Sequence, residues 1–348
     1  MRSAAVAQAG GYWVSTGTTA YERVDGAGTV LRNGDVLATG GQSSNPRSAE
    51  LYDPRTGLWT LTGSMLESRW IHTSTLLKNG EVLVAGGFDG FSQAQAWTDV
   101  YDPSTGTWSS TGKMTVARMG HTATLLPNGQ VLVVGGVTDT YATTASSEVF
   151  VPKRSKWLRV GSMSTPRHDF GTVLLDTGKV LAMGGNPGFT QTWLSSADLY
   201  DPATRTWSPT GSMTYGRYGF VTALLPDGRV LVAGGCCDSN FMPIASAEIY
   251  DPATGLWSVT GSLSTAREWA SATVLRNGLV LVAGGDDYGD PLASAELYDP
   301  ATGVWSSTGD MIVNREFFPL LRLPDTQVLA FGGGTTADLY IPPSTPQG

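Results

Sequence analysis

The stretch from Arg229 to Gly261 decides the fold, because the same pattern is written seven times along the chain. It reads RVLVAGG at 229–235 and, after a variable insert, SAEIYDPATGLWSVTG at 246–261. A repeat with a fixed period of 20 to 50 residues indicates a solenoid or a propeller. The Gly-Gly pair returns every 46 to 50 residues, beginning at Gly40, Gly86, Gly135, Gly184, Gly234, Gly284 and Gly332.

Each repeat predicts four short strands joined by turns of recognisable type. Strands 1 and 2 are joined mostly by Asn-Gly or Asp-Gly pairs, which tolerate positive φ at both turn positions. Only the last repeat lacks the glycine and has Asp325-Thr326 instead. Strands 3 and 4 are joined by a turn of the form DPxTG, in which proline presets φ and glycine ends the turn. A tryptophan marks strand 4, at Trp59, Trp108, Trp157, Trp207, Trp257 and Trp305.

The seventh tryptophan of this kind stands at the other end of the chain. It is Trp13, in the sequence WVSTG at 13–17, whereas the C-terminal repeat stops after its strand-3 sequence around Tyr340. The last blade is therefore predicted to take its outer strand from the N-terminus and its inner three strands from the C-terminus. Such a closure joins the ends of a ring and removes open sheet edges.

With its repeated Gly-Gly pairs, spaced tyrosines and tryptophans, the chain resembles a kelch-repeat β-propeller of the galactose-oxidase-like superfamily over essentially its whole length. The resemblance implies an all-β, seven-bladed propeller with four antiparallel strands per blade around a central channel. It does not imply one function. We expect a single domain over 1–348, with blades at approximately 18–63, 64–112, 113–161, 162–211, 212–261, 262–309 and 310–341 plus 10–17.

Composition narrows the class of partner. Acidic residues number 30 against 22 basic ones, which disfavours a nucleic-acid partner, since such binding rests on a basic footprint. No run of about 18 apolar residues is present, so no membrane association is expected. We expect a monomer that binds a small molecule, a glycan or a protein. The start, MRSAAVAQAG, is too short for a complete signal peptide, and the localisation stays open between the cytoplasm and secretion with the signal removed.

Seven arginines recur just before strand 1, and seven carboxylates recur two residues before the strand-3 aromatic residue. A ring of arginines could bind an anion at the channel mouth. Because the two counts are equal and the positions are fixed, we instead expect each arginine to pair with a carboxylate within or between blades. The arginines are Arg23, Arg69, Arg118, Arg167, Arg217, Arg267 and Arg315, and the carboxylates are Glu50, Asp99, Glu148, Asp198, Glu248, Glu296 and Asp338.

One face of the ring is expected to carry the function. Antiparallel strands place the regular 1-2 and 3-4 turns on one face, and the 2-3 inserts and 4-1 connections on the other. Nearly all irregularity falls in those inserts and connections, and function concentrates in such segments. Surplus aromatic residues there either form an apolar or sugar-stacking pocket or pack the inserts onto the blades. The tryptophans among them are Trp70, Trp97, Trp193 and Trp269.

The position directly after each repeat arginine holds the candidate catalytic residues. It is occupied by Glu268 and Glu316 in neighbouring blades and by His168 roughly across the mouth. Paired carboxylates facing an imidazole among aromatic rings suit general acid-base catalysis without a cofactor; a solvated rim is the alternative. The candidate ligand-binding residues on the same face are Trp70, Trp269, Tyr218, Tyr215, Asp169, His72, His121, Phe317, Asp286 and Cys236.

Metal chemistry has weaker support in the sequence. His72, His121 and His168 are the only histidines, so a three-histidine metal site competes with histidines that hydrogen-bond to their neighbours. The resemblance to galactose oxidase implies a copper centre built from two tyrosines, two histidines and a Cys-Tyr crosslink. This sequence has no Tyr-His dipeptide, and the iron-associated motif of the plant specifier proteins is also absent. We therefore expect no metal and no cofactor.

Two inserts open with paired residues whose role the sequence leaves open. Cys236 and Cys237 are predicted to be a reactive thiol, a vicinal disulfide or inert lining. Asp286 and Asp287 either orient a ligand hydroxyl or cap their own loop. Two functions follow from the whole pattern. The first is a small-molecule pocket with cofactor-free acid-base catalysis of the lyase, isomerase or cyclase type, and the alternative is a non-catalytic module that recognises a protein or a glycan.

Overall fold

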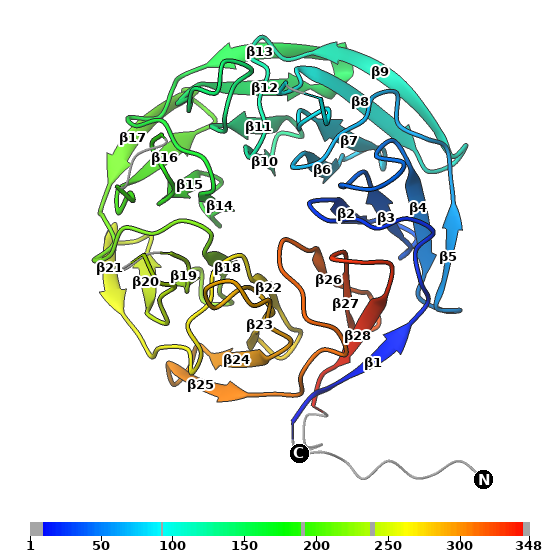
Figure 1. Cartoon of the computed structure of the whole chain (residues 1–348). Helices are drawn as coiled ribbons and strands as arrows, with labels where there is room; N and C mark the ends of the chain where they lie inside the picture. Colours follow the sequence, from blue (N-terminus) through cyan, green and yellow to red (C-terminus); the bar gives the residue numbers. More distant parts are fainter. Residues whose placement is uncertain (1–9, 92, 189–191, 237–240, 344–348) are drawn as a thin grey trace, which may run out of the picture.

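The computed structural model describes residues 10–91, 93–188, 192–236 and 241–343. Over these residues, 28 strands form seven four-stranded antiparallel sheets arranged as the blades of a ring (Figure 1). The one helix in the described part of the chain is the short 3-10 helix η1 (Pro152–Arg154). The predicted all-β, seven-bladed propeller is confirmed. Among the described residues, we find no helix with the length and apolar character needed to cross a membrane.

The first four complete blades follow one another along the chain, and each contains four consecutive strands. Their strands are β2 (Ala27–Val30), β3 (Val36–Thr39), β4 (Ala49–Asp53) and β5 (Leu58–Leu61); β6 (Thr73–Leu76), β7 (Val82–Ala85), β8 (Trp97–Asp102) and β9 (Thr107–Lys113); β10 (Thr122–Leu125), β11 (Val131–Val134), β12 (Ser147–Val151) and β13 (Lys156–Val160); β14 (Gly171–Leu174), β15 (Val180–Met183), β16 (Ala197–Asp201) and β17 (Thr206–Thr210).

Two further blades repeat this order, and the last blade combines the two ends of the chain. Their strands are β18 (Val221–Leu224), β19 (Val230–Ala233), β20 (Ala247–Asp251) and β21 (Leu256–Val259); β22 (Ser271–Val274), β23 (Val280–Ala283), β24 (Ala295–Asp299) and β25 (Val304–Ser307); β26 (Leu320–Arg322), β27 (Val328–Phe331), β28 (Ala337–Ile341) and β1 (Tyr12–Thr16).

The second strand of each blade is buried on both faces, which explains why it reads as an unbroken apolar run. In β19, Leu231 and Ala233 pack in one core cluster with β23 of the next blade. Val230 and Val232 pack in another cluster with β15 of the preceding blade. Alternate residues of one strand therefore face opposite neighbours, and the blades share their cores around the ring.

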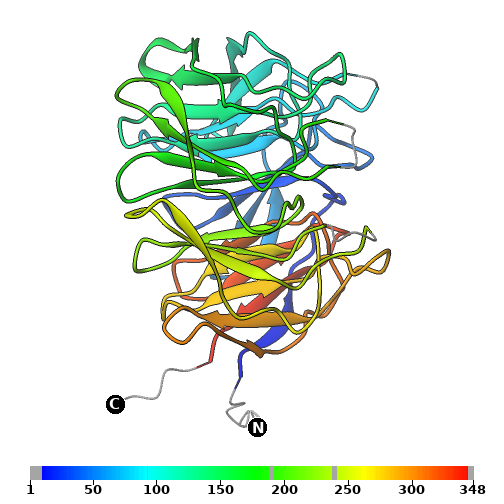
Figure 2. The ribbon, with the colours of Figure 1, turned by 90° about the vertical axis from the view of Figure 1, so that its left-hand side faces the viewer.

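The ring is closed by β1, as the position of Trp13 predicts. β1 pairs antiparallel with β28, with Trp13 opposite Tyr340, and Trp13 belongs to the core cluster of the last blade. In Figures 1 and 2, β1 in blue lies beside β28 in red at this blade. The closing strand gives the seventh sheet the same four-strand order as the other six.

The aromatic residues of strands 3 and 4 connect neighbouring blades. Tyr250 lies within hydrogen-bond distance of Thr210 in the preceding blade, with 2.8 Å between their hydroxyl oxygens. Trp257 packs on Tyr250 and donates its indole N–H to the carbonyl oxygen of Gly211, also in the preceding blade, at 2.8 Å. In this blade, both rings therefore fill the gap between sheets and satisfy their polar atoms there.

The 1-2 turns differ from the prediction at one position. In the first blade, Gly34 has a φ of 93°, but Asn33 does not have a positive φ. The N–H of Leu31 donates to the carbonyl oxygen of Asp35 and that of Gly34 to Leu31. This is the longer hairpin loop in which a type I turn is followed by one residue of positive φ, so only the second residue of the pair needs to be glycine. In the last blade, Thr326 takes that place with a φ of 90°.

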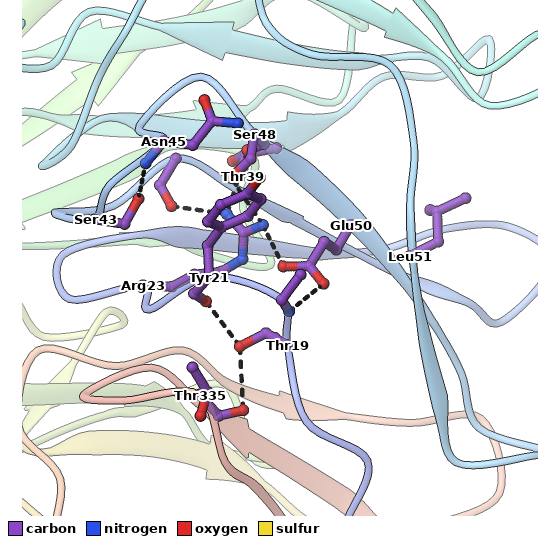
Figure 3. Close-up of polar contacts among 12 residues, drawn as sticks. Thr19, Tyr21, Arg23, Thr39, Ser43, Asn45, Ser48, Glu50, Leu51 and Thr335 are labelled. Carbon is purple, nitrogen blue, oxygen red and sulfur yellow. Dashed lines mark hydrogen bonds and ion pairs between the residues drawn. The ribbon is translucent and has the colours of Figure 1, made fainter.

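All seven arginines pair with their carboxylates inside a blade, as expected, and both partners are buried. Figure 3 shows the first pair: Arg23 donates to Glu50 at 2.7 Å and to the carbonyl oxygen of Gly40 at 2.8 Å. Glu50 also accepts the backbone N–H of Ala20 at 2.8 Å. The pair thus fastens the 4-1 connection, which carries the arginine, to strand 3 of its blade.

Each pair should fix a 4-1 connection to its own blade, so that removing one partner is costly. We expect Glu248→Ala to lower the free energy of unfolding by about 3–5 kcal/mol, because it leaves the Arg217 charge buried without its partner. Chemical denaturation followed by tryptophan fluorescence measures the change.

Two matched variants control this prediction. Arg55→Ala removes an exposed ion pair with Asp53 and should leave the denaturation midpoint unchanged. The double variant Arg217→Met with Glu248→Leu should recover most of the loss, because it removes both charges together. A Glu248→Ala protein as stable as the wild type would contradict the proposed role of the pairs.

Candidate functional site

A cavity of about 350 Å³ lies around the axis and is lined by residues from all seven blades. In every blade, the lining begins with the second and third residues after the repeat arginine, just before strand 1. The residues at the second position are Asp25, Ile71, Gly120, Asp169, Gly219, Trp269 and Phe317.

These seven residues share an unusual backbone conformation. All have φ between 49° and 62°, in the left-handed region that bulky residues such as Ile71 and Trp269 seldom enter. Backbone hydrogen bonds join neighbouring blades through this position and form two runs. The first links Asp25 to Ile71 to Gly120, and the second links Asp169 to Gly219 to Trp269 to Phe317. Each run therefore begins at an aspartate, and the strained backbone is held by its neighbours around the axis.

Aromatic rings form a continuous arc along one side of the mouth. Phe317 lies 4.5 Å from Trp269 between ring centroids, Trp269 lies 5.5 Å from Tyr218, and Tyr218 lies 4.9 Å from Trp193. Phe241 meets the edge of Trp193 at 6.2 Å. The arc spans four consecutive blades, from the 2-3 insert after β15 to the connection before β26.

Two carboxyl groups at the mouth have strongly raised pKa values. Burial, followed by the charge of Asp25, raises the pKa of Asp169 to about 7. Burial, followed by the charges of Asp286 and Glu316, raises the pKa of Glu268 to about 7. In both groups the loss of hydration disfavours the ionised form, and a nearby negative charge adds to that effect.

The charges of Glu268 and Asp169 both raise the pKa of the same tyrosine. Burial raises the pKa of Tyr218 to about 12, and the charges of Glu268 and Asp169 contribute to that shift. Tyr218 belongs to the blade between theirs, so the two carboxyl groups lie on either side of it. The Oε2 atom of Glu268 is buried without a hydrogen-bond partner among the described residues. A buried oxygen of this kind is ready to bind a proton or a donor from a ligand.

The structure brings together two of the three predicted catalytic residues. Burial, followed by the charges of Asp286 and Asp25, raises the pKa of Glu316. The charge of Glu316 in turn helps to raise the pKa of Glu268. His168 contacts neither glutamate: its Nε2 lies 3.6 Å from Asp169 and its Nδ1 lies 3.0 Å from the Thr143 hydroxyl. Burial lowers the pKa of His168, so its imidazole is neutral at pH 7. None of the three lines the cavity itself, whereas their sequence neighbours do.

The other histidines bond to neighbouring blades, as the repeat suggests. The Nε2 atom of His72 lies 2.9 Å from the hydroxyl of Thr39, and that of His121 lies 3.1 Å from the hydroxyl of Thr73. Burial lowers the pKa of His121 to about 3 and that of His72 well below its usual value. Both imidazoles line the cavity as neutral groups. Over the described residues, no three His, Cys, Asp or Glu side chains are grouped closely enough to hold a metal ion.

The remaining predicted ligand-binding residues divide between the cavity and the inserts. Trp70 packs on Phe88, in the 2-3 insert of the same blade, with 5.3 Å between ring centroids. Tyr215 is exposed and does not line the cavity. Asp286 caps its own loop, since it accepts the backbone N–H groups of Tyr288 and Gly289 at 2.7 and 2.6 Å.

The cysteine pair is described only in part. Cys236 is buried and forms a disulfide, so the reactive-thiol alternative does not apply to it. Cys237 lies outside the described residues.

Asp25 is the residue that the sequence prediction missed. The pattern that finds it is the second position after the repeat arginine, which brings Asp25 into register with Asp169. Reading only the first position selects residues that form bridges with the start of the 2-3 insert, such as Glu268 with Asp286. The chain then turns at the second position, where φ is positive, and the residues at the second and third positions line the cavity.

Comparison with known proteins identifies the family. The family model of the kelch motif matches residues 23–66, 72–115, 166–214, 217–264 and 270–312, which make up more than half of the chain. The chain belongs to the kelch-repeat family. A search of curated proteins gives no match for this kelch propeller.

Solved structures share the fold of this kelch propeller. One is a fungal alcohol oxidase of the AA5 family in complex with copper, with 20% identity and a TM-score of 0.79 over 97% of this chain and 77% of that chain. Another is YjhT, with 16% identity and a TM-score of 0.67 over 84% of this chain and 99% of that chain. At these identities, the likeness shows the propeller fold alone.

The side chains of this kelch propeller do not fit a copper centre like the one implied by the oxidase relationship. The Nε2 atoms of His72 and His121 face threonine hydroxyl groups of neighbouring blades rather than each other. The Nδ1 atom of His168, in the connection before the fourth blade, lies 3.0 Å from the hydroxyl of Thr143. The three imidazoles therefore do not converge, and we assign no step to copper.

Because the pKa of Glu268 is raised, the stability of the protein should depend on pH. Folding raises this pKa from 4.5 to about 7, so the folded protein keeps a proton that the unfolded chain releases, and stability falls as the pH rises between these values. Glu268→Gln removes that penalty. We expect the variant to exceed the wild type by about 2 kcal/mol at pH 8 and to match it at pH 4.

Chemical denaturation at both pH values measures this difference. Glu81→Gln, a substitution of the same kind at a partly exposed position in a 1-2 turn, is the matched control and should follow the wild type at both. A Glu268→Gln variant that is less stable than the wild type at pH 8 would overturn the interpretation.

Proposed function

We propose that this kelch propeller binds a small molecule at the mouth of its central channel and catalyses a cofactor-free proton transfer there, in a reaction of the lyase, isomerase or cyclase type. One observation carries the proposal. Asp169 and Glu268, each with a pKa of about 7, lie on either side of Tyr218 beside the aromatic arc. Carboxyl groups tuned toward neutral pH are suited to give and take protons at that pH.

The two carboxyl groups supply complementary roles. Near pH 7, each is present in both protonation states, so one can accept a proton from the ligand while the other donates one. Glu268 directly precedes the lining residue Trp269 and has a buried oxygen without a hydrogen-bond partner among the described residues, and Glu316 helps to keep its pKa high. The Tyr218 hydroxyl, with a pKa of about 12, stays protonated between the two carboxyl groups. His168 lies beside Asp169, with 3.6 Å between its Nε2 and the carboxylate, and is not part of the cavity lining.

The cavity and its lining suit a small ligand. Its volume of about 350 Å³ falls within the range of about 300–1,000 Å³ typical of small-molecule sites. Trp269, Phe317 and Phe318 provide apolar surface on one side, and Asp25 and Asp169 provide polar groups on the other. An apolar wall with a few convergent polar groups orients a ligand and excludes water from the reacting atoms.

Solvent exchange offers a test that does not require the substrate to be known. We would screen small sugars, amines and aromatic compounds for stabilisation of the protein in thermal unfolding, and then incubate each hit with the protein in D₂O. Mass spectrometry should reveal product or incorporated deuterium with the wild type. Glu268→Gln and Asp169→Asn should bind the same hits and slow the exchange by about 100-fold or more, as expected for loss of a general acid or base.

Glu81→Gln in a 1-2 turn on the opposite face is the matched control and should keep the full rate. Ligands that bind without any exchange or conversion, or exchange that survives in both carboxyl variants, would contradict the proposed function.

A second candidate is a non-catalytic recognition module for a glycan or a protein. Aromatic side chains at the tips of the 2-3 inserts favour it, since Phe91 is 91% exposed and Tyr288 is 67% exposed. Exposed rings of this kind serve as contact points in recognition surfaces. Substitution of Phe91 and Tyr288 by serine should leave solvent exchange intact if the cavity carries the function, and should abolish binding if the insert tips carry it.

A further inference from the structure

Neighbouring blades are joined by four kinds of hydrogen bond that recur around the ring. Two lie near the axis, and their donors are the N–H at the second position after the repeat arginine and the N–H of the second glycine in the Gly-Gly pair. Two lie near the rim, and their donors are the N–H of the glycine after strand 4 and the indole N–H of the strand-4 tryptophan. All four occur between the fourth and fifth blades: Gly219 to Asp169 at 3.2 Å, Gly185 to Arg217 at 2.8 Å, Gly211 to Gly255 at 3.1 Å and Trp257 to Gly211 at 2.8 Å.

The closing seam, between the last blade (β26, β27, β28 and β1) and the first blade (β2 to β5), lacks three of these four bonds. In Figure 1, it separates β27 and β28, in red, from β2 and β3, in blue. The N–H groups of Asp25 and Gly333 donate to no residue of the described chain, and the indole N–H of Trp59 is buried without a partner there. The rim bond from Gly17 to Gly57 remains, at 3.0 Å. Over the same described residues, each of the other six junctions keeps at least three of the four kinds.

The course of the backbone in the last blade explains the missing bond of Gly333. In the other six pairs, the first glycine has a φ of 57–68° and the second a φ of 92–103°. In the last blade this order is reversed, with 99° at Gly332 and 71° at Gly333. The connection between its second and third strands has five residues, 332–336, against nine to thirteen in the other blades. Gly333 is exposed, whereas the second glycine of every other pair is buried.

Side-chain packing at the closing seam also differs from the other junctions. Two residues after the strand-4 glycine, the other connections have a buried methionine or leucine, such as Met213 in the core between the fourth and fifth blades. The seam has Thr19 instead, whose hydroxyl donates to the carbonyl oxygen of Thr335 at 3.1 Å (Figure 3). Across the seam, Phe331 packs on Trp59 with 5.1 Å between ring centroids. Apolar packing is non-directional, so it fixes the two blades less firmly than hydrogen bonds do.

We propose that the propeller opens locally at the closing seam, beside the mouth of the central cavity. Asp25 of the first blade and Phe317 of the last blade both line the cavity, on either side of the seam. Within the described chain, Glu316 lacks the bridge to a 2-3 insert that the equivalent residue forms in each of the other six blades. An opening at this place widens the mouth. The proposal goes beyond the proposed function, because it concerns access to the cavity and does not depend on the reaction.

Local opening is the expected behaviour of such a junction. Folded proteins open first where few hydrogen bonds hold neighbouring segments, at a free energy below that of global unfolding. Each hydrogen bond that is not formed removes part of the barrier to separating the first and last blades. The fourth and fifth blades, with all four bonds, provide the matched reference within the same molecule.

Cysteine labelling measures the opening directly. Leu329 and Leu181 occupy the same position in the second strand of the last and fourth blades, and both are 0% exposed. Leu329 lies in the core of the closing seam and Leu181 in the core between the fourth and fifth blades. We would react Leu329→Cys and Leu181→Cys with a thiol reagent under native conditions, with the wild type as the blank. We expect Leu329→Cys to react about tenfold faster or more, because fewer hydrogen bonds must break to expose it.

Hydrogen exchange in the wild type gives a second readout, which holds even if Leu329→Cys fails to fold. The N–H of Gly17 donates across the closing seam, and that of Gly211 donates from the same position across the reference junction, at 3.0 and 3.1 Å. We expect the protection factor of Gly17, measured by NMR, to be about tenfold lower or less than that.

Both measurements can overturn the proposal. Equal labelling rates for the two cysteine variants, or a Gly17 amide as well protected as that of Gly211, would contradict a seam that opens locally. Denaturation midpoints of the two variants separate local opening from global unfolding. Faster labelling of Leu329→Cys that is fully accounted for by a lower midpoint would also contradict it.

Discussion

A buried arginine in every blade holds the connection that carries the site residues. Arg217, for example, donates to Glu248 and to the carbonyl oxygen of Gly234, while Glu248 also accepts the backbone N–H of Thr214 from the same connection. The residues just after each arginine are therefore fixed against the blade and directed toward the axis. Because breaking a buried pair costs far more than removing both charges, the arrangement works as a positional device rather than as a source of stability. The rest of the site depends on it.

Seven such fixed points create a ring of backbone in the left-handed conformation. A regular propeller would fill this ring with glycine, as Gly120 and Gly219 do. Here the second position instead holds aspartate, isoleucine, tryptophan and phenylalanine in the other blades. The side chains around the channel mouth therefore differ from blade to blade, although the backbone repeats. Asp169 and Asp25 begin the two hydrogen-bonded runs, and Trp269 with Phe317 supplies the aromatic side. Strain stored at a position of this kind is a recognised mark of functional sites.

The fold could be predicted from the sequence because every blade carries the same motifs at the same positions. The Gly-Gly pairs, the tryptophans and the displaced copy at Trp13 determine the blade number and the closure. The seven arginine-carboxylate pairs follow from equal counts at fixed positions. The site could be predicted only in part, because the positive φ at the second position after the arginine is not evident from residue type. The prediction selected Glu268 and Glu316 at the first position, whereas the cavity is lined by the second and third positions, including Asp25. The position of His168 beside Asp169, rather than opposite the glutamates, depends on packing between blades that no repeat pattern encodes.

The central claim is that the channel mouth holds two carboxyl groups tuned to exchange protons near neutral pH. Its most direct test is a carbon-13 NMR titration of the side-chain carboxyl groups in the wild-type protein, with the two resonances assigned by their loss in Glu268→Gln and Asp169→Asn. The account predicts that both groups titrate near pH 7, because each is buried beside another negative charge. Titration of both groups near pH 4, as in unfolded peptides, would contradict it.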